Sequence, residues 1–466
     1  MRHMIENNHD LSSAGAALAA TISGDVLTPD SPGFDEERSG FQLLDAHRPA
    51  LIVAADNGDD VVAAVRFATE NGAPVAVQST GHGLATPFDG NGVLISTRRL
   101  TSVTVNPSER TAWVEAGAQW RNVIDAAAPH GLAPLSGSLP TVGVVSYILG
   151  GGVGILSRSY GFAADHVRRI DIVTADGRPR QVTATSDPDL FWALRGGGGN
   201  FGVVTGIEID LMPVERIYGG GLVFDLEQTP QLPEVWYRWT ADVPEAMASA
   251  VSMLTFPDVP DVPEPLRGKH VGSIQIAYNG SAEDGAELVK PLRELGPVID
   301  GLTEIPYGES EKVFNEPDQP HPYRGENLLL RDVDPSRLPA LVKLSSPQTQ
   351  PMCVVGLRHL GGALSRSPEV PNAVGNRSAN YVLGVLSLTL PGQFDAVREM
   401  HDEALAAWSD LAIGQGLNFT FGAVEQDKIR SAFDAADYER LTEIRAAVDP
   451  EEVFRANFPI PPKSDS

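Results

Sequence analysis

The sequence predicts an α+β protein with more than one domain. The chain has 466 residues, which is too long for one ordinary hydrophobic core. Apolar residues make up 42% of it and charged residues 21%, as is usual in globular proteins. Short apolar runs bounded by glycine, proline or aspartate recur between helical patterns, so we expect strands and helices along most of the chain.

The first half of the chain predicts strands and helices in alternation. We expect a helix at 59–72, because this segment starts with acidic residues and stops at a glycine, and a strand on either side at 48–56 and 73–78. The Asp176-Gly177 pair predicts the turn of a hairpin over 167–184. The other elements expected here are helices at 14–24 and 120–131 and strands at 92–100, 102–118 and 199–214.

The second half changes character and predicts a sheet covered by helices. A last helix at 437–449 precedes an irregular tail at 450–462. These changes divide the chain into three predicted segments, 1–215, 216–411 and 412–466. Within the middle segment we expect strands at 221–227, 271–280, 352–360 and 381–390 and helices at 281–295 and 393–408.

Charge and cysteine content limit the classes of partner. The formal charge is −26, and no cluster of basic residues offsets it, so we expect binding neither to nucleic acid nor to a membrane surface. No run reaches the ~20 apolar residues of a membrane helix. The single cysteine, Cys353, excludes an internal disulfide and a thiolate metal site, which fits a cytoplasmic protein. We predict no metal.

Three glycine-rich loops lie within the first half of the chain, at 80–83, 150–154 and 196–200. Glycine lets a ligand approach the backbone, and exposed backbone amides can bind phosphate. The dinucleotide-binding template G-x-G-x-x-G fails on both possible alignments of the second loop, which place Ile155 or Ser157 in its third glycine position. A nicotinamide reductase of the Rossmann type therefore loses its main support, as do nucleotide triphosphatases, zinc proteases and serine hydrolases.

His82 stands between two glycines directly after the strand expected at 73–78. A flavin dinucleotide is long, partly apolar and carries a diphosphate, so several glycine loops could line it. The histidine itself could serve packing, bind a ligand or be an attachment point, and the residues alone leave these three roles open.

Five motifs in a fixed order resemble the berberine-bridge-enzyme-like flavoproteins of the vanillyl-alcohol-oxidase superfamily. The resemblance runs from about Arg48 to Ile460, which is most of the chain. The string DPDLFWALRGGGGNFGVVT is the most specific of the five. The others are RPALIVAADNGDDVVAAVRFATENGAPVAVQSTGH, LPTVGVVSYILGGGVGILSRSYGFAADHV, LRHLGGAL and DYERLTEIRAAVDPEEVFRANFPI.

The resemblance implies a fold, a cofactor and its contacts. The fold is a PCMH-type FAD-binding domain in two parts, N-terminal and returning C-terminal, with an inserted α+β substrate domain whose antiparallel sheet covers the flavin. The cofactor is FAD, covalently joined to His82. The other residues implied to contact it are Gln78, Ser79, Thr80, Gly81, Gly83, Leu139, Gly143, Gly151, Gly152, Gly154, Val204 and Asn457.

Departures from the family pattern change the expected chemistry. Many members carry a second tether, a cysteine, where this chain has Leu139, so we predict a single histidyl link. Members often carry a tyrosine base where this chain has Gly416, and a histidine where it has Tyr147. Val142 occupies the position implied to gate oxygen, and valine there goes with oxygen reactivity.

The resemblance implies an FAD-dependent oxidase acting on a small molecule. It would remove hydride from a C–H bond next to O or N, pass the electrons to O2 and act in natural-product tailoring. Candidates for the missing base are Tyr381, His359 and Tyr147, although each could simply belong to the core. The alternatives are a flavin monooxygenase, an amine oxidase of the 6-hydroxynicotine oxidase type and a flavin-binding protein without catalysis.

Overall fold

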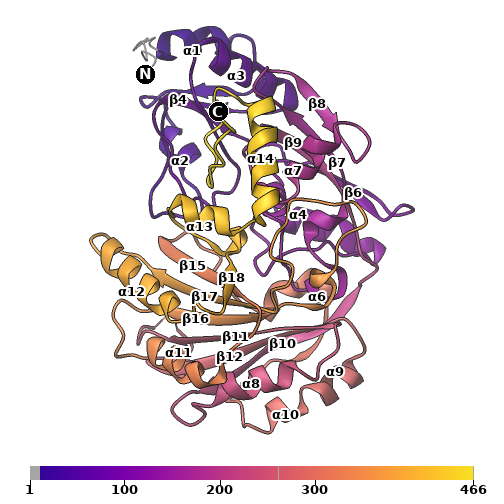
Figure 1. The fold of residues 1–466 in the computed structure, drawn as a ribbon, viewed down its shortest axis with the longest axis vertical. Helices are drawn as coiled ribbons and strands as arrows, with labels where there is room; N and C mark the ends of the chain where they lie inside the picture. Colours follow the sequence, from indigo (N-terminus) through magenta and orange to yellow (C-terminus); the bar gives the residue numbers. More distant parts are fainter. Residues whose placement is uncertain (1–10, 261, 465–466) are drawn as a thin grey trace.

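Three sheets organise the computed structural model, which describes residues 11–260 and 262–464 (Figure 1). Two of them, with the C-terminal helices, form what we call the two-sheet part, residues 11–214 and 419–464. The third sheet, with its helices, lies below it in Figure 1. Residues 1–10 of the first predicted segment lie outside the described residues.

The first sheet has four strands in the order β1-β2-β4-β3, and its strands β2, β4 and β3 run parallel. Asn57 caps helix α3, since its side chain accepts a hydrogen bond from the amide of Asp60. The helix and both strands expected around it are confirmed. The elements are α1 (Leu11–Ala19), β1 (Asp25–Leu27), α2 (Phe34–Arg38), β2 (Arg48–Ala54), α3 (Gly58–Glu70), β3 (Val75–Gln78) and β4 (Asp89–Ser96).

The second sheet is antiparallel, in the order β5-β6-β9-β7-β8. The predicted hairpin is confirmed, since Gly177 has a φ of 69° in the turn between β7 and β8. The strands are β5 (Val103–Asn106), β6 (Thr111–Glu115), β7 (Val167–Val173), β8 (Pro179–Val182) and β9 (Val203–Asp210). The helices are α4 (Trp120–Ala127), α5 (Val144–Leu149), α6 (Ser157–Tyr160) and α7 (Pro188–Leu194).

The third sheet has nine strands, in the order β13-β10-β12-β11-β16-β17-β15-β18, with β14 also pairing with β10. Strand β18 belongs to it, so the sheet continues slightly beyond the predicted boundary at residue 411. The strands are β10 (Arg216–Asp225), β11 (Met247–Thr255), β12 (His270–Tyr278), β13 (Ile299–Asp300), β14 (Thr303–Pro306), β15 (Tyr323–Leu330), β16 (Val354–His359), β17 (Tyr381–Leu388) and β18 (Ala412–Gly414).

The helices of the middle segment cover one face of this nine-stranded sheet (Figure 1). They are α8 (Leu232–Thr240), α9 (Ala282–Leu288), α10 (Lys290–Arg293), α11 (Leu338–Leu344) and α12 (Phe394–Ala406). The side chains of Val355 and Leu357 on β16 point into the core beneath these helices. Because successive side chains alternate along a strand, Gly356 and Arg358 lie on the opposite face, toward the two-sheet part. We call this opposite face the site face.

The C-terminal segment returns to the two-sheet part, as the predicted fold requires. Helices α13 (Gln426–Ser431) and α14 (Ala435–Val448) pack there, and α14 contacts α7. The tail then lies beside β3, because the amide of Val75 donates to the carbonyl of Val453 and the amide of Arg455 donates to the carbonyl of Val75, both at 2.7 Å. The tail thus pairs with the strand that leads into the loop of His82.

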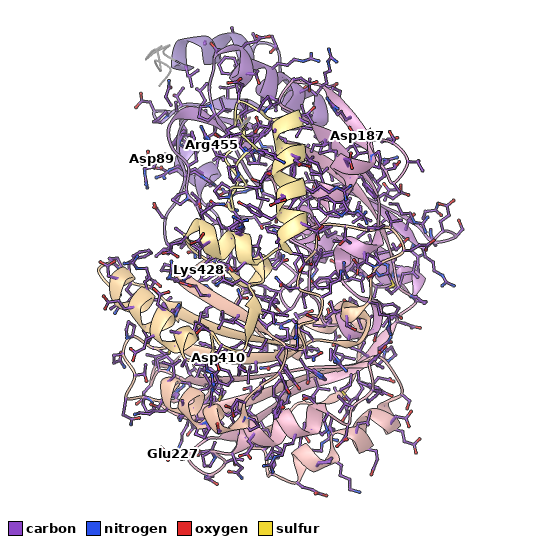
Figure 2. All side chains as sticks on the ribbon, in the orientation of Figure 1. Asp89, Asp187, Glu227, Asp410, Lys428 and Arg455 are labelled. Atoms are coloured by element: carbon purple, nitrogen blue, oxygen red, sulfur yellow. The ribbon has the colours of Figure 1, made fainter. Side chains whose placement is uncertain are left out.

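Charged side chains are spread over the outside of the molecule. The labelled Asp89, Asp187, Glu227 and Asp410 are all exposed (Figure 2). None of the helices in the described ranges combines the length and the apolar character that crossing a bilayer requires. In the same residues, no group of three or more His, Cys, Asp or Glu side chains is placed to hold a metal ion.

Candidate active site

The loop after β3 bends sharply against the N-terminal segment. Gly81 has a φ of 69°, a backbone conformation that favours glycine. A Cβ atom there would lie 2.5 Å from the Cα of Gly40, so a side chain is excluded on packing grounds as well. This bend directs the next residue, His82, toward the nine-stranded sheet.

The imidazole of His82 is held on both edges and on one face. Its Nδ1 lies 3.1 Å from the hydroxyl of Thr80, and its Nε2 lies 3.2 Å from the hydroxyl of Thr141. The ring of Phe41 stacks on it with 3.9 Å between centroids and 10° between planes. Burial, with a smaller effect of His321, lowers the pKa of His82 to about 4. The ring is therefore neutral and fixed in orientation at neutral pH.

The residues around His82 fit the FAD that the sequence predicts. The hydroxyl of Ser79 and the Oε1 atom of Gln78 are buried and have no hydrogen-bond partner among the described residues. A buried polar atom without a partner is rare in a folded protein. The backbone of Gly83 borders open space, since a Cβ there would meet no atom within 4 Å. Ser146 adds an accessible hydroxyl, because it is the one exposed residue of α5. The loop thus offers polar atoms and open backbone, as a cofactor with hydroxyls and phosphates requires.

The second loop expected at the cofactor lies against the first. The amide of Gly143 donates to the hydroxyl of Thr80 at 3.2 Å. Leu139 and Val142 pack in one apolar cluster with Phe41 and Tyr323. The hydroxyl of Tyr323 in turn donates to the carbonyl of His82 at 2.8 Å. The structure therefore brings the expected oxygen gate, the position of the second tether and the histidine into one place.

The glycine loop at 150–154 is fixed by Asn418. The Oδ1 atom of Asn418 accepts from the amide of Gly152 at 3.1 Å, and its Nδ2 donates to the carbonyl of Tyr147 at 3.0 Å. Gly151 and Gly152 have φ values of 104° and 78°, so this loop needs glycine for its conformation. Gly154 is needed for packing, since a Cβ there would lie 2.0 Å from the carbonyl oxygen of Ser136.

The third glycine cluster, at 196–200, serves packing. A Cβ at Gly196 would lie 2.6 Å from the amide nitrogen of Val374, and one at Gly197 would lie 2.5 Å from the carbonyl oxygen of Ala193. Arg445 of α14 donates to the side chain of Asn200 at 2.9 Å, and this joins the loop to the C-terminal segment. The cluster therefore connects the two parts of the chain.

Two further residues expected at the cofactor lie in supporting positions. Val204 is a buried residue of β9 in the core of the two-sheet part. Asn457 of the tail accepts from the amide of Ala85 at 3.3 Å through Oδ1, and its carbonyl accepts from the hydroxyl of Thr86 at 2.8 Å. Asn457 thus ties the tail to the loop just after His82.

Two of the three candidate bases are occupied by other contacts. Tyr381 lies in the helix-covered core of the nine-stranded sheet, where its hydroxyl is 2.8 Å from that of Thr240. The Nε2 atom of His359 faces Nη1 of Arg158 at 2.9 Å, and since arginine only donates, that nitrogen is an acceptor. Burial, together with Arg158, lowers the pKa of His359 to about 3. The Nδ1 atom of His359 has no partner among the described residues, but it carries the proton when Nε2 accepts from Arg158, so it offers no free electron pair.

Tyr147 lies beneath the glycine loop. Its hydroxyl is buried without a hydrogen-bond partner among the described residues, and its ring packs edge-on against Trp120. Burial raises the pKa of Tyr147, against a smaller lowering by the charge of Arg358. At neutral pH it is a protonated phenol, which can donate a hydrogen bond but cannot act as a base.

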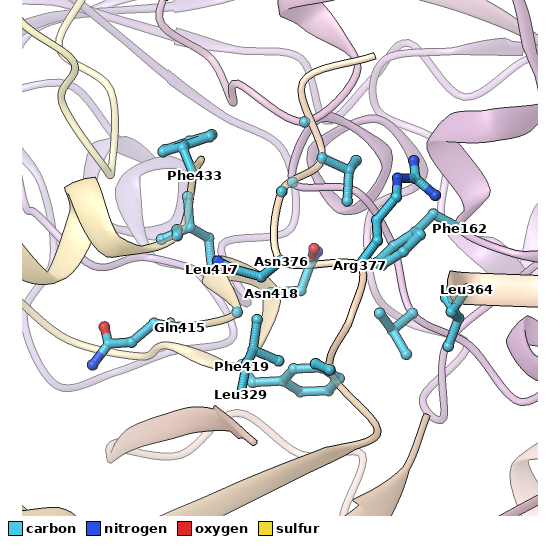
Figure 3. Close-up of a pocket in the computed structure, with 18 of the residues that line it drawn as sticks. Phe162, Leu329, Leu364, Asn376, Arg377, Gln415, Leu417, Asn418, Phe419 and Phe433 are labelled. Carbon is cyan, nitrogen blue, oxygen red and sulfur yellow. The ribbon is translucent and has the colours of Figure 1, made fainter. Parts of the chain in front are cut away.

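A cavity of about 50 Å³ lies between the glycine loop, the site face and the C-terminal segment (Figure 3). Gly416, at the position of the family's tyrosine base, lines it, and Asn327 of β15 holds the backbone of Gly416 with hydrogen bonds of 2.8 and 2.9 Å. Its walls are mainly apolar. The side chains labelled in Figure 3 are Phe162, Leu329, Leu364, Asn376, Arg377, Gln415, Leu417, Asn418, Phe419 and Phe433.

Sequence reasoning missed Arg358, which lies on the site face. Its guanidinium is over the ring of Phe314 at 4.5 Å and over that of Phe419 at 5.1 Å. It makes no hydrogen bond and no ion pair to any described residue. The exposed Glu316 accepts a hydrogen bond from Ser138 at 2.9 Å. Surrounding protein atoms raise the pKa of Glu316, and the charge of Arg358 lowers it by a smaller amount. Alternation along β16, with Val355 and Leu357 apolar, could have indicated that Arg358 faces the site.

Comparisons with known proteins indicate an FAD-binding protein. A family model described as "FAD binding domain" matches residues 49–183, and one described as "Berberine and berberine like" matches residues 421–461. The chain is 27% identical over 490 residues to (R)-6-hydroxynicotine oxidase of Paenarthrobacter nicotinovorans, with 97% of this chain and 99% of that protein covered.

Two further comparisons span nearly the whole chain. The uncharacterised FAD-linked oxidoreductase YgaK of Bacillus subtilis (strain 168) is 25% identical over 454 residues, which cover 95% of this chain and 97% of that one. The solved structure of a chitooligosaccharide oxidase superposes with a TM-score of 0.83 at 18% identity, covering 97% of this chain and 100% of the other, which shows a common fold. The predicted fold class is confirmed.

Proposed function

Since the chain belongs to the berberine-bridge-enzyme-like FAD-linked oxidoreductases, we propose that it is an oxidase whose FAD is covalently attached to His82 alone. It oxidises a C–H bond next to oxygen or nitrogen in a small organic molecule. The substrate loses two electrons and two protons, and O2 takes them up to give hydrogen peroxide. Bound FAD supplies the two-electron acceptor for this reaction.

One observation carries the proposal, the arrangement of His82. An attachment point must be a nucleophile, and only a neutral imidazole has the free electron pair that this requires. Its low pKa keeps His82 neutral, and Thr80, Thr141 and Phe41 fix the orientation of the ring. The same ring lies in the segment matched by the FAD-binding family model.

The single tether is supported by the positions of two residues. Leu139, in the place of the second tether, is an apolar member of the cluster around Phe41. Cys353, the only cysteine of the chain, is 1% exposed and belongs to the core beneath the helices, on the opposite face of the nine-stranded sheet. No thiol therefore lies on the cofactor side. A buried, unpaired cysteine also suits the cytoplasm, where we expect the enzyme to act.

The chemistry proposed for the substrate needs no strong protein base. Tyr381 and His359 are engaged elsewhere, Tyr147 stays protonated, and Gly416 has no side chain. A substrate whose proton is acidic, or an amine that is already neutral, can lose hydride without one. We propose O2 as the electron acceptor because Val142 occupies the position that the family resemblance implies to gate oxygen. This residue follows Thr141, whose hydroxyl lies beside His82.

A second candidate is amine oxidation, favoured by the nearly complete alignment with (R)-6-hydroxynicotine oxidase. In this case the bond oxidised is a C–H next to nitrogen. A monooxygenase is a further alternative, in which one atom of O2 enters the organic product. Peroxide formed in equal amount to substrate consumed distinguishes an oxidase from an oxygenase, because an oxygenase places one oxygen atom in the product.

The test of the proposal is acid precipitation followed by peptide mapping. A yellow pellet whose flavin peptide contains His82 is expected from the native chain and from Cys353→Ser. His82→Ala should give a colourless pellet, while His130→Ala, at an exposed histidine, should behave as the native protein. Anaerobic addition of candidate substrates should then bleach the flavin absorbance. A colourless pellet from the native chain would overturn the covalent link.

A further inference from the structure

Two glycines lie side by side at the centre of the site face. Gly356 of β16 is opposite Gly384 of β17, and the same transverse row continues to Asn327 on β15 and Ser252 on β11. In this row the side chain is absent on the two central strands, small at Ser252, and bonded to Gly416 at Asn327. We call Gly356 and Gly384 the glycine floor.

Protein packing does not explain the glycine floor. A Cβ added at Gly384 would meet no atom within 4 Å, and one at Gly356 would meet only the carbonyl oxygen of Val251, at an ordinary 3.6 Å. Neither residue has a positive φ. Glycine in the interior of a strand weakens the strand, and it often marks a close approach by a ligand. The floor therefore leaves a flat space that the protein itself does not need.

A cation stands at the edge of this floor. Arg358 follows Gly356 by two residues on β16, so its side chain is on the same face. The rings of Phe314 and Phe419 flank the guanidinium. An arginine remains protonated in a protein and offers five N–H donors in a planar fork. In the described part of the chain none of these donors has an acceptor, although a carboxylate would satisfy two of them at once.

We propose that the substrate is a flat molecule with an anionic oxygen group, which binds the guanidinium of Arg358 while the ring system lies on the glycine floor. The inference rests on the proposed function for placing the substrate beside FAD. It adds the shape and charge of the substrate. Phe314 and Phe419 hold the guanidinium in position beside the floor.

The test uses two probes of the same shape and different charge, anthracene-2-carboxylate and anthracene-2-carboxamide. Their affinities for the holoenzyme are measured by fluorescence titration without turnover. The carboxylate should bind about tenfold or more tightly than the amide. Arg358→Gln should remove this preference, and Arg358→Lys should restore part of it, because lysine keeps the charge but not the fork. Gly384→Val should weaken binding of both probes by at least about tenfold.

Control measurements keep this result separate from the function. Arg169 of the five-stranded sheet also stacks on an aromatic ring, that of Trp113 at 4.3 Å. Arg169→Gln therefore removes the same charge far from the floor, and it should leave the affinities for both probes unchanged. Covalent flavin content is measured for every variant and should not change. Equal affinities for the two probes, or no binding of either, would overturn the inference while leaving the flavin link intact. A shift of flavin potential in Arg358→Gln with unchanged probe preference would also overturn it.

Discussion

Two arginines lie on opposite faces of the nine-stranded sheet and have opposite surroundings. Arg324 of β15 faces the helices, is 1% exposed, and donates to the carboxylate of Glu326 and, at 3.1 Å, to the carbonyl of Ala423. Arg358 of β16 is on the site face and has no acceptor among the described residues. A buried charge is costly unless it is paired, so the paired arginine belongs to the structure and the unpaired one is available for a ligand.

The two faces differ in the same way beyond these arginines. On the helix side, Lys428 of α13 continues the network with contacts to Glu326 at 2.6 Å and Asp402 at 2.9 Å, so the charges are matched. On the site face, the central positions are the glycines Gly356 and Gly384. Stability and ligand binding are therefore divided between the two faces of one sheet, and substitutions on each face should affect different measurements.

The largest effect on stability is expected from Arg324→Gln. It leaves a buried carboxylate, that of Glu326, with Lys428 as its remaining cation, and breaking a buried pair costs about 3–5 kcal/mol. Arg358→Gln should change the free energy of unfolding by only about 1 kcal/mol, since it removes two ring contacts and no ion pair. Urea denaturation of both variants measures the difference. Similar losses in the two variants would contradict the division between the faces.

A pair of glycines tests how much of the site face is open. Gly325→Ala on β15 should cost about 1–3 kcal/mol, because its Cβ would lie 2.7 Å from the ring of Phe421. Gly384→Ala on β17, in the neighbouring strand, should be neutral or stabilise the protein by up to about 1 kcal/mol. Thermal unfolding of the two variants, with covalent flavin content as control, measures this contrast. A marked destabilisation by Gly384→Ala would mean that the space is needed for folding.

The sequence was sufficient where the signal is local. The turn at Asp176-Gly177 could be predicted from contiguous residues. The cofactor role of the His82 loop and the return of the C-terminal segment followed from the resemblance of their motifs to a known family. The likeness in fold then follows, because these motifs occur in a fixed order along the chain. The same resemblance also placed Val142 and Leu139 in the segment that lies beside His82.

Features that depend on strand register could not be predicted. Strands β11 and β15 were not expected. Without them the residues that lie opposite Gly356 and Gly384 in the transverse row could not be identified. The stacking of Phe41 on His82 joins residues that are far apart in the sequence and has no local pattern. Tyr381 was chosen as an aromatic residue on a strand, although its neighbour Val382 is the one that faces the site.

A buried histidine on the helix side should contribute to the acid sensitivity of the fold. His401 of α12 is 0% exposed, and its Nε2 lies 3.0 Å from the hydroxyl of Ser387. Burial lowers the pKa of His401 to about 4, and Arg324 is the next cause. Among the smaller effects, Asp402 raises this pKa and Lys428 lowers it. The folded pKa lies below the unfolded value near 6.5. The unfolded state therefore takes up the proton first, and stability is lost as the pH falls from 6.5 toward 4.

His401→Gln removes this titration while an amide can still bond to Ser387. The slope of unfolding free energy against pH between 6 and 4 should fall by about 1 kcal/mol per pH unit. His47→Gln is the matched control in the two-sheet part, where burial also lowers the pKa of His47 to about 4, so its effect should be similar and additive. An unchanged slope in both variants would show that these histidines do not control the acid limit.

The smallest expected effect is that of Tyr381→Phe. The hydroxyl of Tyr381 bonds to Thr240 beneath the helices, so its loss should cost about 1 kcal/mol of stability and leave kcat and its pH profile unchanged. Tyr323→Phe is the matched control on the site face, because that hydroxyl donates to the carbonyl of His82, and it should lower the covalent flavin content. A hundredfold or greater fall of kcat in Tyr381→Phe would restore this tyrosine as the base. Such a result would require the sheet to present its helix-covered side to the substrate, which the cores on its two faces exclude.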